Sequence, residues 1–200
     1  MRTKTEVKKK AILEEAAKLF QELGYEAASM AELCARVGGS KSTLYSYFPS
    51  KEELFFEVML SQFEVDLVAS FAPLDDAQLG CAAALTAYGN RFLSLNYRTE
   101  VIAGARLAIA ESTRGDLGKR VYERAPLKAR RRLAEFLATA MQSKHLRESE
   151  PMLAATQLIA LLKAELDLEA LLNVRSQPSA TWIAAATDRA MDTFMRAYAI

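Results

Sequence analysis

The 200-residue sequence is poor in the side chains that build most catalytic and metal sites. It has two cysteines and one histidine. Cys34 and Cys81 stand alone among apolar residues, without the paired spacing of a zinc site. His145 lies in a polar stretch that is typical of a loop or helix end, and no nucleophile or ligand set surrounds it. We therefore predict no enzyme active site, no metal and no cofactor.

Long apolar runs are also missing. A typical one, LGCAAALTAY, is far shorter than the ~20 residues that cross a bilayer. The N-terminus MRTKTEVKKK leads into charged sequence and not into the apolar core of a signal peptide. The composition is 51% hydrophobic and 26% charged, which is ordinary for a folded protein and excludes a disordered one. We expect a cytoplasmic protein.

Strand alternation is absent, and helical spacing recurs along the whole chain, so the fold class is predicted to be all-α. In the front part, Gly24 and two capping boxes, Ser29 to Glu32 and Ser50 to Glu53, mark helix ends. They predict helices at 5–23, 30–36 and 51–70, and a short one from Ser40. The apolar stripe of the first helix is Ile12, Ala16, Leu19, Phe20 and Leu23, and that of the second is Met30, Leu33, Cys34 and Val37. The stripe of the helix at 51–70 is Leu54, Phe55, Val58 and Met59.

Further along, the first plausible domain seam is the stretch 72–76, where a proline and two aspartates interrupt the pattern. We predict an N-terminal domain at 1–50, a linking helix at 51–70 and a larger helical domain at 71–200. Its helices are predicted at 76–96, 99–113, 116–143 with a kink at Pro126, 151–173 and 179–198.

Positive charge gathers at the front of a chain whose net charge is only +1. The first ten residues hold five basic side chains and one glutamate. This excess is a modest indication of a polyanionic partner, and a solvated basic tail explains it equally well.

The stretch GGSKSTLYSYFPSKEEL, 38–54, carries the most specific signal. Two short helices joined by a glycine turn and packed on a longer first helix describe a helix-turn-helix, whose second helix enters the major groove of DNA. Only Leu44 and Phe48 need to face inward. The remaining side chains form a polar surface suited to base edges and phosphates, namely Ser40, Lys41, Ser42, Thr43, Tyr45, Ser46 and Tyr47.

Phosphate contacts are expected at the two capped helix starts, Ser29 and Ser50, and at Lys51. Lys51 is unfavourable for the dipole of its own helix, which a neighbouring phosphate would explain. Each residue has a plainer alternative. Tyr45 and Tyr47 are candidates for half-buried packing, the lysines for solvated charges and the serines for helix caps alone.

Residues 10–56 resemble the DNA-binding domain of the TetR (tetracycline repressor) family of bacterial regulators. The family pattern AGVSxGTLYxYFxxKEELF stands here as VGGSKSTLYSYFPSKEELF. The resemblance implies operator contacts by the region of Ser29, by the exposed face from Ser40 to Tyr47 and by Lys51. The departures are Val37 for Ala, Gly39 for a turn Val and Ser42 for a common Gly.

For the rest of the chain the resemblance implies a variable helical domain that binds an effector and dimerises. The sequence favours a homodimer through the last two helices, with stripes Ile183, Ala186, Ala190, Phe194, Ala197 and Leu158, Leu161, Leu162, Leu172. The alternative is that these stripes bury only against their own subunit.

An effector pocket is expected between the helices from 76 to 170. Arg106 is its most interesting candidate, since a buried guanidinium needs an anionic partner, either Glu111 or an acidic ligand. The candidates for the lining are Tyr88, Phe92, Arg106, Tyr122, Phe136 and Met141. The carboxylates Glu165, Asp167 and Glu169 are interpreted as a solvated helix face or as salt-bridge partners.

The sequence thus predicts a homodimeric, ligand-responsive repressor that binds a pseudo-palindromic operator in double-stranded DNA. A shift of the linking helix on ligand binding would release the DNA. The alternative is a helical small-molecule or protein-binding module whose helix-turn-helix no longer reads DNA. The effector and the operator sequence are not encoded in any recognisable pattern.

Overall fold

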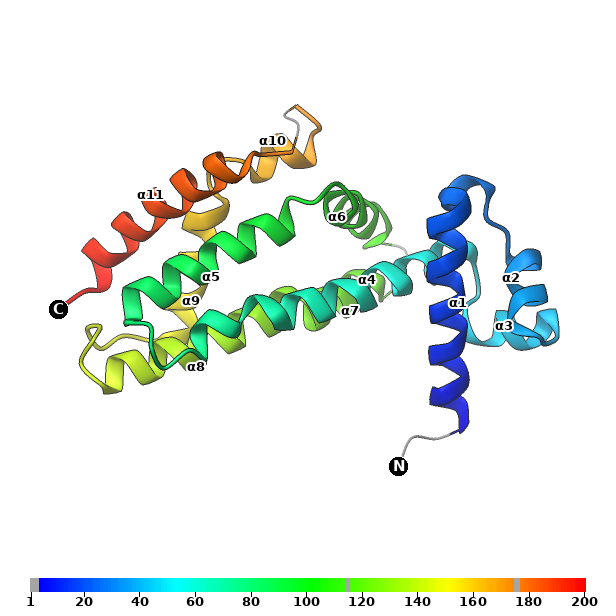
Figure 1. Cartoon of the computed structure of the whole chain (residues 1–200), viewed down its shortest axis with the longest axis horizontal. Helices are drawn as coiled ribbons and strands as arrows, with labels where there is room; N and C mark the ends of the chain where they lie inside the picture. The colour runs from blue at the N-terminus through cyan, green and yellow to red at the C-terminus, as the bar shows by residue number, and fades with distance from the viewer. Residues whose placement is uncertain (1–3, 114–115, 175–176) are drawn as a thin grey trace. The chain divides into compact units, whose positions relative to one another are not determined.

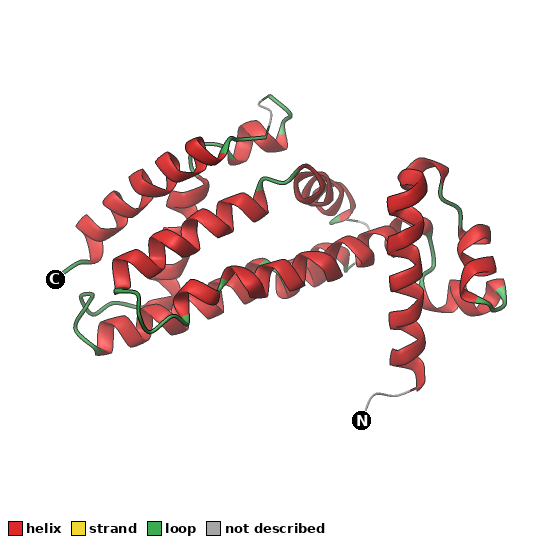
Figure 2. Ribbon diagram, viewed as in Figure 1, coloured by secondary structure: helices red, strands yellow, loops and turns green. Residues whose placement is uncertain are grey.

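In the computed structural model the chain is helical throughout, and no strand forms among the residues that it describes (Figures 1 and 2). These are residues 4–113, 116–174 and 177–200, with the side chains of Lys4 and Glu111 outside the description. The chain divides into two compact units, Met1–Gln62 and Phe63–Ile200. None of the described helices has the length and apolar character to cross a membrane.

Unit 1 contains three helices and the first part of a fourth. Their order and approximate bounds confirm the prediction for the front of the chain. They are α1 (Lys4–Ala27), α2 (Met30–Val37), α3 (Lys41–Tyr47) and α4 (Lys51–Ser70), and α4 continues into unit 2.

The ends of these helices follow the predicted caps. The hydroxyls of Ser29 and Ser50 accept hydrogen bonds from the backbone N–H groups of Glu32 and Glu53, both at 3.1 Å. Gly24 leaves the helical conformation with φ of 76°, although helical turns resume up to Ala27. The position predicted as the end of the first helix is therefore a kink within α1.

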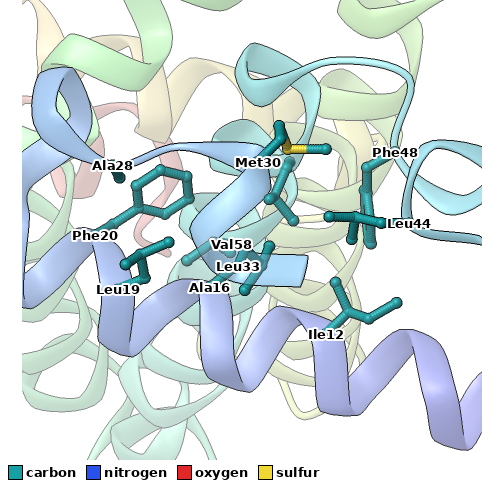
Figure 3. Close-up of a cluster of buried hydrophobic side chains, with 11 residues drawn as sticks. Ile12, Ala16, Leu19, Phe20, Ala28, Met30, Leu33, Leu44, Phe48 and Val58 are labelled. Carbon is teal, nitrogen blue, oxygen red and sulfur yellow. The ribbon is translucent and has the colours of Figure 1, made fainter. Parts of the chain in front are cut away.

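One apolar core holds unit 1 together. Ile12, Ala16 and Leu19 of α1 are buried together with Leu33 of α2 and Leu44 of α3 (Figure 3). Leu23 was predicted to belong to this stripe and does not, because it is exposed beside the kink at Gly24. The core fixes the orientation of α2 and α3 on α1.

Lys51, the first residue of α4, ties that helix to the end of α1. Its Nζ donates to the backbone carbonyls of Tyr25, Glu26 and Ala28 at 2.8, 3.3 and 3.2 Å. It also lies 4.3 Å from the centre of the Tyr25 ring. These carbonyls lie at the negative end of α1, so they give the cation the favourable partners that its own helix start lacks.

The same junction includes an aromatic contact and a hydrogen bond. The ring of Phe55 lies 4.7 Å from that of Tyr25, and the Tyr25 hydroxyl donates to Glu52 at 3.1 Å. Burial, together with this carboxylate, raises the pKa of Tyr25 to about 12. Tyr25 therefore remains a hydrogen-bond donor at neutral pH.

Unit 2 is also helical, but its predicted long helices are divided. The predicted helix start at 76 is wrong, and the predicted helices at 116–143 and 151–173 are each interrupted, near 125 and near 165. The observed elements are η1 (Ala72–Leu74), α5 (Cys81–Asn96), α6 (Thr99–Glu111), α7 (Leu117–Arg124), α8 (Pro126–Gln142), α9 (Pro151–Lys163), α10 (Asp167–Leu171) and α11 (Ala180–Tyr198).

Each division has a local cause. The residues after η1 form a turn, in which the Asp76 carboxylate accepts from the N–H of Gln78, so α5 begins only after Gly80. Pro126 has no N–H to donate, and the predicted kink there is a complete break between α7 and α8. At the end of α9 the backbone tightens into three-residue turns, in which the N–H groups of Ala164 and Leu166 donate to the carbonyls of Leu161 and Lys163.

Helix α5 packs against both α11 and α9. The close approach requires Gly89, because a Cβ at this position would lie 2.8 Å from Thr187 Cγ2 and 3.0 Å from Leu162 Cδ2. Leu85, Leu93 and other buried residues of α5 complete this core.

The stripe predicted to form a dimer contact faces inward instead. Ile183, Ala186, Ala190 and Phe194 of α11 are buried within their own unit, and Leu158 and Leu162 of α9 are buried as well. The periodicity therefore marks the core of one protomer, as the alternative reading of the sequence allowed. Ala197 and Leu172 are exposed, and Leu161 is half-buried.

The two turn glycines should respond differently to substitution. Gly38 has φ of 66° and Gly39 does not have a positive φ. We expect Gly38→Ala to lower the free energy of unfolding by about 1 kcal/mol and Gly39→Ala to leave it unchanged within about 0.5 kcal/mol. Urea unfolding of the whole chain, followed by circular dichroism, tests this pair. Equal effects of the two substitutions would contradict the assigned turn conformation.

Lys51→Ala should lower the free energy of unfolding by about 1–2 kcal/mol, because three carbonyls lose a charged donor. Lys41→Ala is the matched control, since Lys41 is exposed at the start of α3. Thermal melts of both variants make the comparison. A Lys51→Ala melt that superimposes on the wild type would show that this cap adds nothing to stability.

Candidate nucleic-acid interface

The turn between α2 and α3 is held by three local contacts. Gly38 is in the left-handed conformation, and its N–H donates to the Cys34 carbonyl at 3.2 Å. The thiol of Cys34 donates to the Gly39 carbonyl at 3.0 Å. Ser40 then caps α3 by accepting from the N–H of Thr43 at 3.1 Å. A helix, a tight turn and a second short helix follow in direct succession.

Helix α3 has a clear inner and outer side. Leu44 and Phe48 are buried, as predicted, against the unit 1 core (Figure 3). The outer side consists of exposed residues at successive turns, and we call it the outward face of α3. Its members are Lys41, Ser42, Tyr45 and Ser46.

Thr43 and Tyr47 differ from the other candidates between residues 40 and 47, because both are half-buried. Tyr47 packs against the unit 1 core, so the packing interpretation applies to it. Tyr45 is 46% exposed and has its ring on the outward face. The two tyrosines therefore take different positions, although both were predicted for the polar surface.

The hydroxyl groups at the start of α3 are connected to one another. The Ser40 hydroxyl lies 2.8 Å from that of Ser42 and 2.9 Å from that of Thr43. The Ser46 hydroxyl donates to the Thr43 carbonyl at 2.7 Å. These bonds orient short side chains while each oxygen keeps acceptor capacity. Such groups can pair with base edges or phosphates.

The candidate phosphate contacts lie at helix starts. Ser29 is exposed, while Ser50 and Lys51 are half-buried. The ammonium group of Lys51 is already held by three carbonyls of α1 and its following turn. It can act on a phosphate through its charge, since its donors have protein partners.

Two lysines of α1 lie beside α3 and were not singled out by the sequence. Lys8 lines a small, partly open hollow together with Ser40 and Thr43. Lys9 has its Nζ 5.7 Å from the centre of the Phe48 ring. The excess of basic residues at the N-terminus was the available signal, but it could not indicate which lysines approach α3.

The residues that depart from the family pattern, Val37, Gly39 and Ser42, are accommodated in and beside the turn between α2 and α3. Gly39 also lines the hollow, and a Cβ there would meet no atom within 4 Å. The missing valine side chain leaves space and does not distort the backbone. Val37 is half-buried against the core, and Ser42 is exposed.

The six candidates for an effector pocket are not all brought together. Tyr88 and Phe92 of α5 are buried, with ring centres 5.7 Å apart. Met141 is buried and Phe136 half-buried on α8. Tyr122 is at the surface, where its hydroxyl accepts from Arg130 at 3.0 Å.

Arg106 has partners that the sequence did not indicate. Its guanidinium donates to the carbonyls of Leu171 and Ala170 at 2.8 and 2.6 Å. It therefore caps the end of α10 and stabilises the contact of α6 with that helix. The carboxylate of Glu111, proposed as an alternative partner, lies outside the described side chains.

Three buried oxygen atoms in unit 2 lack a hydrogen-bond partner within the part of the chain that the structure describes. They are the hydroxyls of Tyr88 and Thr187 and the Oδ1 of Asn90. An unsatisfied buried polar group costs roughly 1–3 kcal/mol, so such groups are rare in folded proteins. Burial also raises the pKa of Tyr88, so its hydroxyl stays protonated.

The carboxylates near 165 are salt-bridge partners, which agrees with their interpretation from the sequence. Arg189 of α11 donates to both oxygens of Glu165, at 2.8 and 2.7 Å. This bond lowers the pKa of Glu165 below its usual value. Lys163 lies 2.8 Å from Asp167. His145 is exposed in the turn after α8.

Comparisons with known proteins agree with this geometry in both units. Residues 12–58 match the model of the tetR family of bacterial regulatory proteins. Residues 83–200 match the model of the C-terminal domain of AefR-like transcriptional repressors. The second match alone covers more than half of the chain.

Several relatives extend over much of the chain. The transcriptional regulator RutR of Escherichia coli O157:H7 is 31% identical over 135 residues, which are 60% of this chain and 59% of RutR. This match therefore spans about three fifths of that relative's length.

Solved structures also match nearly all of the chain. A TetR-family regulator from Mesorhizobium loti has 26% identity, a TM-score of 0.81 and full coverage of both chains. The flavonoid-responsive regulator FrrA has 31% identity and a TM-score of 0.73, and the match covers 97% of this chain and 98% of FrrA. The helix-turn-helix of unit 1, both family matches and these relatives lead to one conclusion: the chain belongs to the TetR family of bacterial transcriptional regulators.

Proposed function

We propose that the protein is a ligand-responsive repressor that acts in the cytoplasm, as a homodimer, on a pseudo-palindromic operator. It is a regulator and not an enzyme. One observation carries the proposal. The outward face of α3 offers a lysine, two serines and a tyrosine, while Leu44 and Phe48 hold the opposite side in the core.

The contacts divide into two kinds. We assign base reading to the outward face, where Lys41 can donate to guanine O6 and N7 and Tyr45 can contact bases or the backbone. Ser40 and Thr43 support this face through their linked hydroxyls. Ser29, Lys51 and the hydroxyl of Tyr47, whose ring packs on the core, are assigned to phosphates, which position the protein without reading sequence.

The homodimer is proposed to form through the last helices, by the surface opposite the buried stripes. Leu168 of α10 and Leu172, which directly follows that helix, are 69% and 65% exposed, and Leu153 of α9 is 50% exposed. Large exposed apolar residues that lie one helical turn apart, such as Leu168 and Leu172, favour an interface between proteins. A two-fold axis through such a surface would pair the same patch on both protomers.

Effector binding is assigned to unit 2, and the response to α4. The relative FrrA is a flavonoid-responsive regulator, which supports a small-molecule effector for this chain as well. Helix α4 begins in unit 1 and ends in unit 2. A ligand that displaces its end would change the spacing of the two reading heads in a dimer, and DNA would be released.

Lys41→Ala and Tyr45→Ala should change the preference among duplex sequences, because both side chains belong to the outward face of α3. A lost bidentate contact to guanine lowers discrimination at one base pair by about 1–3 kcal/mol. Binding of the purified variants to a randomised duplex pool, followed by sequencing, measures it. Unchanged preferences in both variants would remove α3 from the reading role.

Lys51→Ala should weaken binding to all duplexes alike and reduce the slope of log K against log salt by about one unit. Affinity measured between 50 and 200 mM salt tests this. Because the variant is also less stable, the titration is run well below its melting temperature. Wild-type binding that does not depend on salt would favour the alternative of a helical binding module that no longer reads DNA.

The double substitution Leu168→Glu, Leu172→Glu should convert the dimer into a monomer, since charges would replace exposed apolar contacts. Light scattering after size exclusion gives the mass. Val65→Glu is the matched control, because Val65 is 70% exposed in unit 2 but lies on α4. If the double variant stays dimeric, the interface lies elsewhere.

A further inference from the structure

The core of unit 2 contains a polar group whose position has no structural explanation. The side chain of Tyr88 is 0% exposed, and its hydroxyl has no partner among the described residues. A phenylalanine would fill the same space without burying an unpaired hydroxyl. Buried hydroxyls without partners are rare, and a ligand oxygen beside Tyr88 would supply the missing partner.

The rings around Tyr88 define the shape of such a ligand. Phe71 lies nearly parallel to Tyr88, with ring centres 6.0 Å apart, and Phe92 lies on α5 with its centre 5.7 Å away. Aromatic clusters favour a planar aromatic guest, which can stack or make edge contacts with each ring.

The charge of the ligand follows from the residues around this core. No lysine, arginine or histidine is buried in unit 2 within the ranges that the structure describes; the buried polar residues there are Ser70 and Thr187. Arg106 is half-buried and already engaged by the carbonyls of α10. An ionised ligand group would therefore be buried without a counter-charge, at a high cost in free energy.

We propose that Tyr88 is the hydrogen-bonding anchor for an effector that is an uncharged, planar aromatic molecule with a hydroxyl or carbonyl oxygen. Phe71 and Phe92 hold the rest of the molecule. The inference rests on the proposed function, since it names the class of effector that unit 2 takes. Flavonoids, to which the relative FrrA responds, belong to this class.

The position of Phe71 connects the ligand to regulation. Phe71 directly follows α4, which ends at Ser70. The N–H of Phe71 donates to the carbonyl of Val68 in that helix at 3.1 Å. A ligand between Tyr88 and Phe71 must move this residue, and with it the end of the helix that continues into unit 1.

The test is isothermal titration calorimetry on the full chain at pH 6.5. The probes are two neutral aromatics, naringenin and coumarin, and two anions, palmitate and salicylate. We expect a neutral aromatic to bind the wild type and Tyr88→Phe to weaken its binding about tenfold or more, because the anchor is lost. Phe71→Leu, a second variant at the site, should also weaken it.

Thr187→Val is the matched control. Thr187 also carries a buried hydroxyl without a partner, but it lies against Gly89 at the contact of α5 with α11. The affinity of the Thr187→Val variant for the neutral aromatic should remain within about threefold of the wild-type affinity. Melting temperatures at or above the wild-type value in Tyr88→Phe and Thr187→Val show that both are folded.

Two results would overturn the inference: binding of anions alone, or equal affinity of Tyr88→Phe and wild type for a bound neutral aromatic. Binding of no probe by a protein that still retains operator fragments would also overturn it, while the DNA-binding proposal stands. Failure to retain DNA in the absence of any probe would count against the proposed function instead.

Discussion

The burial of Leu44 and Phe48 determines what α3 can do. A helix of seven residues gains little stability from its own backbone, so its orientation depends on these two anchors. They are held by the core of unit 1, to which Ile12 and Leu33 contribute. With one side fixed inward, Lys41 and Tyr45 must face outward. The same contact therefore makes the helix stable and selects the face that is available to DNA.

The junction of α1 and α4 has a similar double effect. Lys51 binds the carbonyls at the end of α1, close to Ser29 at the start of α2. A positive charge needed for the structure is thus placed beside a helix N-terminus, where phosphate is favoured. The structural role of Lys51 and its proposed contact with phosphate thus fall on one residue. The salt dependence of DNA binding reports the contact, and the free energy of unfolding reports the structural role.

Much of the fold follows from local sequence. The caps at Ser29, Ser40 and Ser50 and the turn at Gly38 are short-range signals, and each determines a helix boundary in unit 1. Pro126 likewise predicted a disruption, although periodicity continued across it and concealed the complete break. The spacing of apolar residues could not distinguish a protomer core from a dimer contact, so the stripe of Ile183 and Phe194 was assigned to the wrong side.

Long-range contacts were not predictable from a single sequence. Arg106 pairs with backbone carbonyls about 65 residues away, and carbonyls leave no mark in a pattern of side chains. The three carbonyl partners of Lys51 were missed for the same reason. The missing partner of the Tyr88 hydroxyl is equally invisible in the sequence, because it depends on which groups three-dimensional packing brings near.

Selection of genomic fragments by the purified protein at about 0.15 M salt tests the central claim most directly. A dimeric reader that uses α3 should enrich a motif with two-fold symmetry, whose half-sites lie one or more helical turns apart. The Lys41→Ala variant should lose or alter that motif. If no motif is shared by the retained DNA, the selection is repeated with protein that has been unfolded, washed free of ligand and refolded. Retained DNA that again shares no motif would contradict sequence-specific reading by this face.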